Sequence, residues 1–325
     1  MVKHRGDDIC GVLLLDKPSG RSSNFYLQRI KHLFNAKKAG HTGSLDPLAT
    51  GLLPLCFGKA TCLSEYFLHS DKAYEAVIQL GVTTDSHDCD GEVLSTLPVN
   101  ISDKQFQETL QSFIGDIEQI PPMVSALKHK GQPLYKLALK GQEVERKPRK
   151  MTVFSLSGQL LENDQASFAV HCSSGFYVRQ LAADIGEKLG CGAHIIALRR
   201  TSSKYLSVQD ALTFDNIEAE FSKIDGSARQ QRIKDVLLPP DDLLKSLPAV
   251  YTDKVHAEHV SHGRKIPIQS VQSWPEQQEA NQHYRLYQSF DSSLVHTDQR
   301  HFLGIAEITQ EGSVKVRRLF NSFCQ

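Results

Sequence analysis

Apolar residues change from a two-residue to a 3.6-residue period several times along residues 11–200. Strand-like segments, alternating or continuously apolar, occupy residues 11–16, 74–81, 153–161, 166–172 and 194–200. Helix-like segments occupy residues 23–34, 61–68, 102–113, 134–140 and 176–189. Ser102, for example, precedes a segment with Phe106, Leu110 and Phe113 on one face, as an N-cap residue does. The pattern predicts a mixture of strands and helices.

The last third of the chain has a different pattern. Residues 215–247 are polar and helical in period, and Pro239-Pro240 interrupts them. Residues 249–325 contain short strand-like pieces between turn residues, the pattern of a small β barrel. Within them, residues 269–299 are rich in Gln, Ser and His, and part of that stretch is expected to form a loop. We therefore predict two domains, residues 1–248 and 249–325.

A glycine-rich stretch, residues 40–51, interrupts the first half of the chain with the sequence GHTGSLDPLATG. Gly40 and Gly43 permit backbone angles that other residues avoid. Asp46 followed by Pro47 is typical of a helix start, with Asp as the N-cap and Pro at the first helical position. Gly51 would lie within that short helix or at its end. The stretch predicts a stiff loop with one carboxylate at a helix N-terminus, and Asp46 could serve there as a cap alone.

Composition describes an ordinary soluble protein, since 40% of its 325 residues are hydrophobic and 23% are charged. No apolar run has the length of a membrane span, and the polar N-terminus lacks the apolar core of a signal peptide. We therefore expect a cytoplasmic location without a membrane partner. The seven cysteines form no C-x-x-C pair, so no zinc knuckle or thioredoxin-like site is indicated.

Charge is balanced overall but uneven along the chain. The formal net charge is zero, yet residues 128–150 contain eight Lys or Arg against two Glu. That excess is compatible with a solvated face or with a surface that follows phosphates. Residues 83–91 are dense in potential metal ligands, but they also suit a solvated turn and lack the spacing of an EF-hand loop.

Four motifs occur together in order: residues 40–51, Tyr74 at the start of a strand, residues 174–179 (SGFYVR) and residues 194–200 (HIIALRR). This set resembles the bacterial tRNA pseudouridine-55 synthase family, the TruB type. Lys17-Pro18 and residues 125–128 (SALK) also match the pattern of that family. The resemblance covers about residues 11–200 and resumes, more weakly, in the C-terminal segment.

The resemblance implies an α+β fold, with a mixed and mainly antiparallel sheet flanked by helices and a small C-terminal PUA-like barrel. It implies isomerisation of uridine 55 in the T-loop of tRNA, in which the C1′–N1 bond breaks and the base rejoins through C5. It also implies that no cofactor or metal is needed, that the T-arm stem-loop of tRNA is the partner, and that the chain acts as a monomer without an obligatory protein partner.

The resemblance places the catalytic aspartate at Asp46 and its arginine partner at Arg179. An ionised carboxylate is needed for a nucleophile or base, and both a helix N-terminus and a nearby cation would favour that form. Attack on C1′, attack on the base, and proton removal to a glycal all remain open. Read without the resemblance, Arg179 would be an exposed helix arginine.

Six further residues receive roles from the resemblance. Tyr74 would stack on the flipped uracil and contribute to catalysis, while Tyr177 and Leu198 would line the pocket. His41 would occupy the place that the flipped base leaves. Lys17 and Lys128 would contact phosphates, which position RNA without specifying its sequence.

Two other functions compete with an isomerase. A tRNA-binding folding chaperone would not need an ionised carboxylate in a pocket. A glycosidase-like hydrolase could use a carboxylate beside C1′, but no second carboxylate in an acid/base pairing is recognisable.

Overall fold

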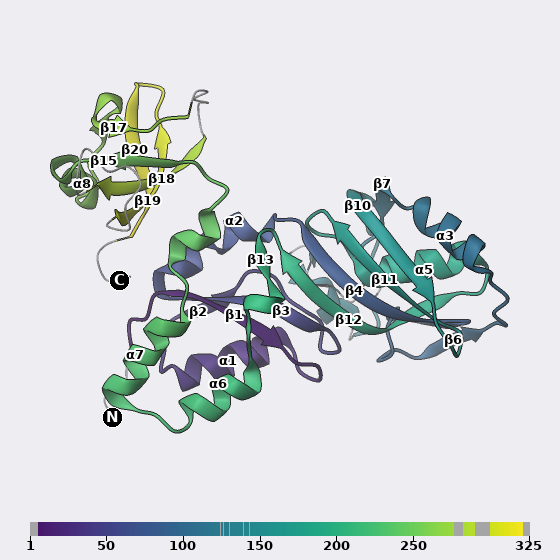
Figure 1. Cartoon of the computed structure of the whole chain (residues 1–325). Helices are drawn as coiled ribbons and strands as arrows, with labels where there is room; N and C mark the ends of the chain where they lie inside the picture. The colour runs from purple at the N-terminus through teal and green to yellow at the C-terminus, as the bar shows by residue number, and fades with distance from the viewer. Residues whose placement is uncertain are drawn as a thin grey trace.

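The computed structural model describes residues 6–275, 282–289 and 300–320, except for the single residues 124, 126, 130, 139 and 143. Of residues 128, 129, 133, 135 and 300 only the backbone is described. Most of these residues form two sheets with helices packed against them (Figure 1). No helix in the described ranges is long and apolar enough to cross a lipid bilayer.

A ten-stranded mixed sheet forms the larger body, with the main order β14-β1-β3-β12-β4-β11-β10-β7. Its ladders are antiparallel except where β1 pairs with β14 and β3 pairs with β12. The strands are β1 (Gly11–Lys17), β2 (Ala39–His41), β3 (Thr50–Phe57), β4 (Lys72–Leu80), β7 (Gly115–Gln119), β10 (Arg149–Leu160), β11 (Gln165–Cys172), β12 (Ala193–Ser203), β13 (Leu206–Ser207) and β14 (Leu212–Thr213). The predicted α+β class with a mixed, mainly antiparallel sheet is confirmed.

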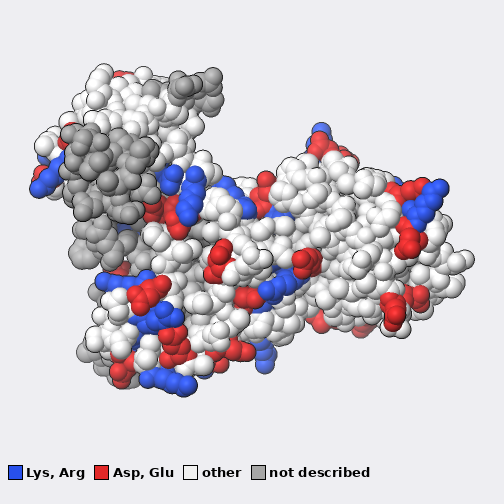
Figure 2. All heavy atoms as spheres, in the orientation of Figure 1, with Lys and Arg blue, Asp and Glu red and all other residues white. Residues whose placement is uncertain are grey.

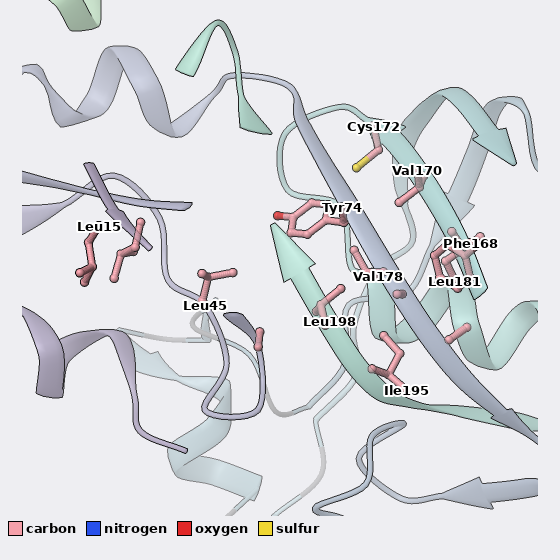
Figure 3. Packing of buried hydrophobic residues seen from close by; sticks show 14 of the residues in the cluster. Leu15, Leu45, Tyr74, Phe168, Val170, Cys172, Val178, Leu181, Ile195 and Leu198 are labelled. Carbon is pink, nitrogen blue, oxygen red and sulfur yellow. The ribbon is translucent and has the colours of Figure 1, made fainter. Parts of the chain in front are cut away.

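Helices cover the sheet in two groups, α1 (Ser23–Leu33) and α6 (Phe214–Phe221) beside β1, and α3 (Asp103–Gln111) and α5 (Val178–Leu189) against β10, β11, β4 and β12. Helix α3 begins with the capping box of Ser102 and Gln105. Helix α5 ends at Gly190 in the left-handed region, with φ of 80°. Val178 and Leu181 of α5 pack on β11 and β12, as Figure 3 shows. This packing holds the first turn of α5 beside the sheet.

The remaining helices and strands before residue 249 connect the elements described above. They are η1 (Gly58–Leu63), α2 (Ser64–Leu68), β5 (Val82–Thr84), β6 (Val93–Thr96), β8 (Lys128–His129), β9 (Gln132–Pro133), α4 (Leu134–Ala138), η2 (Val208–Asp210), α7 (Gly226–Val236) and η3 (Pro240–Leu244). Strands β5 and β6 form a separate two-stranded sheet, as do β8 and β9.

The helix expected at Asp46-Pro47 is absent. Residues 46–49 form a turn in which the Ala49 amide donates to the Asp46 carbonyl at 3.1 Å, and β3 follows from Thr50. Gly51 is already inside β3, paired with β1 on one side and β12 on the other. Sheet pairing has therefore overridden the local Asp-Pro signal. Asp46 is thus not the N-cap of a local helix, contrary to the prediction from the sequence.

The C-terminal segment forms a six-stranded, barrel-like sheet in the order β16-β20-β19-β18-β15-β17, as the PUA-like prediction requires. Its elements are β15 (Ala249–Thr252), α8 (Lys254–Ser261), β16 (Ile266–Pro267), η4 (Ile268–Ser270), β17 (Val271–Gln272), β18 (His283–Ser289), β19 (Arg300–Ile308) and β20 (Ser313–Leu319). Strand β18 lies inside the Gln-, Ser- and His-rich stretch and buries Tyr284, Leu286 and Tyr287. Residues 276–281 and 290–299 of that stretch lie outside the described residues.

Apolar contacts join the two sheets. Ile305 and Phe320 of the C-terminal segment share a buried cluster with Leu63 and Phe67, and the Tyr287 hydroxyl donates to Asp241 Oδ2 at 2.6 Å. The six-stranded sheet begins at Ala249, while a division into domains at residue 248 stays a prediction.

Candidate active site

Asp46 and Arg179 form an ion pair at the edge of the large sheet. Asp46 lies in the turn before β3, and Arg179 lies in the first turn of α5. Arg179 Nε is 3.0 Å from Asp46 Oδ2. The arginine side chain is only 6% exposed, whereas that of Asp46 is 40% exposed. The pair thus presents a partly exposed carboxylate to the pocket that it lines and keeps its cation buried behind it.

Arg179 has a second carboxylate partner, Asp88, which the sequence analysis did not single out. Arg179 Nη1 lies 3.0 Å from Asp88 Oδ2 and also donates to the Ser86 carbonyl at 3.2 Å. Asp88 is buried, and its other oxygen accepts from the Ser86 hydroxyl at 2.5 Å and the Asp90 amide at 3.2 Å. The only sequence signal was the density of acidic residues in 83–91, which favoured a solvated turn or a metal site.

The acidic segment 83–91 contributes the Asp88 carboxylate to a contact within the protein. The described residues contain no group of three His, Cys, Asp or Glu side chains placed to bind a metal ion. Asp88 instead fixes the guanidinium that contacts Asp46. The segment is docked on the sheet because the Ile195 amide of β12 donates to the His87 carbonyl at 3.0 Å.

The electrostatic environment of Asp46 differs from the expectation. Burial in the pocket raises the pKa of Asp46 above its usual 3.8, and the Arg179 guanidinium opposes that rise without cancelling it. The Asp88 carboxylate raises the pKa further. Arg179 favours the ionised form, as predicted, but loss of hydration disfavours it more strongly, so the net pKa lies above its usual value. The pair orients the carboxylate more than it acidifies it.

A pocket of about 490 Å³ opens beside this carboxylate and contains six of the residues predicted for the site. They are His41, Asp46, Tyr74, Tyr177, Arg179 and Leu198. Tyr74 comes from β4 and Leu198 from β12, and Figure 3 shows them near Val178 of α5 and Leu45 of the turn. Both are largely buried, with 9% and 7% exposure. Aromatic and apolar walls of this kind suit a flat organic ring.

Tyr177 immediately precedes α5 and is fixed by Gln119 at the end of β7. The Gln119 amide donates to the Tyr177 carbonyl at 3.2 Å, and its oxygen accepts from the Tyr177 amide at 3.0 Å. Arg149, in the basic stretch, is paired with Gln119 across β7 and β10. Arg149 therefore lies close to the pocket residue Tyr177. Lys147 and Lys150, which are also exposed, are near Arg149 in the sequence.

His41 lies at the end of β2 and lines the same pocket. Its Nδ1 atom is buried and has no hydrogen-bond partner among the described residues. Burial and the nearby Arg200 lower the pKa of His41, so the ring is neutral at neutral pH. A neutral ring can stack on a base without carrying a charge into the pocket.

Lys17 does not reach the surface, which contradicts its expected phosphate contact. Its side chain is fully buried, and Nζ donates to the carbonyls of Ala49 at 2.7 Å, Pro18 at 2.9 Å and Pro47 at 3.3 Å. Burial lowers the pKa of Lys17 to about 8. Through these hydrogen bonds the Lys17 ammonium group stabilises the turn that carries Asp46. The side chain of Lys128, the other expected phosphate contact, lies outside the described residues.

The substitution Lys17→Met should lower the free energy of unfolding by about 1–3 kcal/mol, because it leaves buried carbonyls without donors. It should leave the salt dependence of RNA binding unchanged, measured as the slope of log K against log salt concentration. Lys147→Met, which removes an exposed cation, is the control. A slope reduced by about 1 for Lys17→Met would show that Lys17 contacts a phosphate after all.

Comparisons with known proteins show the family of this chain. Residues 31–178 match the model for the TruB family pseudouridylate synthase N-terminal domain, residues 179–245 the tRNA pseudouridylate synthase B C-terminal domain, and residues 248–320 the C-terminal domain of pseudouridine synthase II TruB. The tRNA pseudouridine synthase B of Stutzerimonas stutzeri (strain A1501) is 43% identical over 99% of each chain. That of Dechloromonas aromatica (strain RCB) is 50% identical over 82% of this chain and 86% of its own.

Solved structures share the fold at lower identity. A chain of an H/ACA RNP bound to a substrate RNA containing 2′-deoxyuridine superposes with a TM-score of 0.69 at 22% identity, over 95% of this chain and 84% of its own. Fold and site together define a pseudouridine synthase, an isomerase. The chain belongs to the TruB family of pseudouridylate synthases.

Proposed function

We propose that this protein isomerises uridine 55 in the T-loop of tRNA to pseudouridine, with Asp46 as the catalytic carboxylate. The observation that carries the proposal is the Asp46–Arg179 pair, whose accessible carboxylate lines a pocket with aromatic and apolar walls. The names of the similar proteins from Stutzerimonas stutzeri and Dechloromonas aromatica support tRNA as the substrate.

The reaction requires that the uridine leave the base stack, because its C1′ atom is otherwise out of reach. In the proposal, Tyr74 stacks on the flipped uracil, Leu198 and Tyr177 enclose it, and His41 fills the vacated space. The C1′–N1 bond breaks, the uracil turns, and C5 forms the new bond to C1′. The proton on C5 is lost and N1 gains one, so the product is an isomer of the substrate.

Asp46 lies against the C1′–C2′ edge of the ribose in each of three routes: attack on C1′, attack on the adjacent base, or removal of the C2′ proton to form a glycal. All three need the ionised carboxylate. Arg179 holds that carboxylate by Nε while Asp88 holds Arg179 by Nη1. These two consecutive ion pairs fix the direction in which the Asp46 oxygens point.

A hydrolase would need a second carboxyl group able to protonate or activate water near the base. Asp88 is the other carboxylate on Arg179, but its side chain is 6% exposed and its oxygens are already bonded within the protein. Its placement does not support glycoside hydrolysis.

RNA outside the pocket requires further contacts. Lysine and arginine side chains are mixed with acidic ones on the face in Figure 2, which therefore has no continuous basic surface. We assign phosphate contacts to the exposed cations at 147–150 beside Tyr177. The barrel-like sheet of residues 249–320 is proposed to bind the acceptor end of tRNA.

The proposal is tested with an unmodified tRNA transcript and a matched transcript that carries cytidine at position 55. Incubation with the protein should give pseudouridine at position 55 of the first and no product from the second. An abasic site at that position would indicate hydrolysis. Tight binding of both transcripts without any product would indicate a chaperone, and either result would overturn the proposal.

A further inference from the structure

Arg200 is a buried cation next to the pocket. It lies on β12, is 2% exposed and is among the largest of the fully buried side chains. Its Nε atom donates to the Leu52 carbonyl at 2.7 Å, and Nη2 donates to the Gly43 carbonyl at 3.1 Å. One guanidinium group therefore holds both ends of the segment 43–52, which carries Asp46.

The same side chain reaches the proposed stacking residue. Arg200 is paired with Tyr74 across the β12–β4 ladder, so the two side chains lie on the same face of the sheet. Burial raises the pKa of the Tyr74 hydroxyl, and the Arg200 charge acts on that hydroxyl to lower it. In Figure 3 that hydroxyl points away from Phe168 and Val170, toward the end of β12. The guanidinium thus connects two parts of the pocket that are separate in sequence, the turn with Asp46 and the ring of Tyr74.

Gly51 makes this connection possible. It is paired with Arg200 in the parallel β3–β12 ladder and has a φ of 101°. A Cβ atom at Gly51 would lie 2.2 Å from the Arg200 carbonyl oxygen, so the two strands could not approach with a larger residue there. The last glycine of the motif therefore brings β12, and with it Arg200, to the catalytic turn.

The charge of Arg200 is not used in an ion pair within the described part of the chain. Its hydrogen-bond partners there are two carbonyls, and Lys72 adds a second buried cation on β4. Lys72 Nζ likewise donates only to carbonyls, those of Ser70 at 2.6 Å and Leu68 at 3.2 Å. Burying cations without carboxylate partners is costly. An apolar residue could pack two strands together without burying a charge. The arginine at this position therefore indicates that the segment 43–52 needs hydrogen-bond donors in fixed directions.

We propose that Arg200 is a positioning residue of the isomerisation. Its guanidinium fixes the distance between the turn that carries Asp46 and the Tyr74 ring, so that a uracil stacked on Tyr74 presents its ribose C1′ atom to the carboxylate. This inference rests on the proposed function, because it takes the roles of Asp46 and Tyr74 from there.

The test measures single-turnover rates of pseudouridine formation at saturating protein, with the Kd for the same RNA. Arg200→Lys keeps the charge but cannot hold the Leu52 and Gly43 carbonyls with the planar geometry of a guanidinium. The rate should fall by about 10- to 100-fold, as expected for a misplaced reacting group, while the Kd changes by less than about threefold. Arg199→Lys is the matched control, because Arg199 is its neighbour on β12 but pairs with Asp16 at 2.7 Å on the other face of the strand. Its rate should stay within about twofold of the wild type.

A double-mutant cycle separates positioning from a general structural role. Tyr74→Phe keeps the ring and removes the hydroxyl on which the Arg200 charge acts. If Arg200 acts through Tyr74, the double variant Arg200→Lys/Tyr74→Phe should be slower than the wild type by clearly less than the product of the two single effects. A brace that only stabilises the sheet would give multiplicative effects and a weakened Kd, and that result would overturn the proposal.

The outcomes also separate this proposal from the proposed function. If the wild-type protein forms no pseudouridine at position 55, the proposed function fails. If the wild type is active and Arg200→Lys keeps its rate, only the role of Arg200 fails. Where Arg200→Lys does not fold, as judged by circular dichroism, Tyr74→Phe alone decides. A rate equal to the wild type refutes the link, and a loss of about tenfold or more with unchanged Kd supports it.

Discussion

Replacement of Asp46 by asparagine should abolish pseudouridine formation in a T-arm stem-loop. The side chain keeps its size and can still accept a hydrogen bond from Arg179, but a carboxamide can neither attack carbon nor accept a proton as a carboxylate does. We expect the single-turnover rate to fall by at least about 10³-fold, within the range seen when a catalytic nucleophile is removed. Binding of the stem-loop should stay within several-fold, because the pocket walls are untouched.

The matched control is Asp184→Asn, which removes a carboxylate from α5 one turn beyond Arg179. Asp184 accepts a hydrogen bond from Gln180 at 2.7 Å and does not line the pocket. Its loss should leave both rate and binding near the wild-type values. Turnover by Asp46→Asn at more than a few per cent of the wild-type rate would remove Asp46 from the reaction and, with it, the proposed mechanism.

The hydrophobic periodicity and the helix-capping residues predicted the strands and helices that carry this site. The alternation of residues 74–81 corresponds to β4, and the apolar face of residues 176–189 corresponds to α5, because both elements bury one side against the same core. The same patterns did not show which residues line the pocket or take part in the reaction. Tyr74 and Leu198 look like ordinary buried residues in period, and only the ordered motifs suggested that they face a pocket.

Where sequence-based predictions differ from the structure, contacts between segments distant in sequence are the cause. Asp46-Pro47 does not start a helix, since Gly51 is held between β1 and β12. The pKa of Asp46 is raised because enclosure by distant segments removes water, which no local pattern reports. Lys17 follows a strand end like a surface lysine, yet the turn folds over it. Asp88 became significant only when its loop docked beside α5.

Replacement of Arg179 by lysine should lower the rate more than the affinity. Arginine contacts Asp46 through Nε and Asp88 through Nη1, each at 3.0 Å, whereas lysine has one nitrogen and cannot hold both carboxylates in this geometry. We expect a loss of about 10²-fold in single-turnover rate, the effect of a poorly oriented reacting group. The Kd of the stem-loop should change by only several-fold.

The pH dependence gives this prediction a second readout. Arg179 is the main group that opposes the burial-raised pKa of Asp46, so its weakening should raise that pKa further. Activity of Arg179→Lys should therefore be lost at a higher pH than that of the wild type as the pH falls. Asp88→Asn should shift this loss to lower pH, because the Asp88 carboxylate itself raises the pKa of Asp46. Opposite shifts in the two variants would show that Arg179 and Asp88 act on the ionisation of Asp46, whereas an unchanged rate and profile for Arg179→Lys would remove Arg179 from the site.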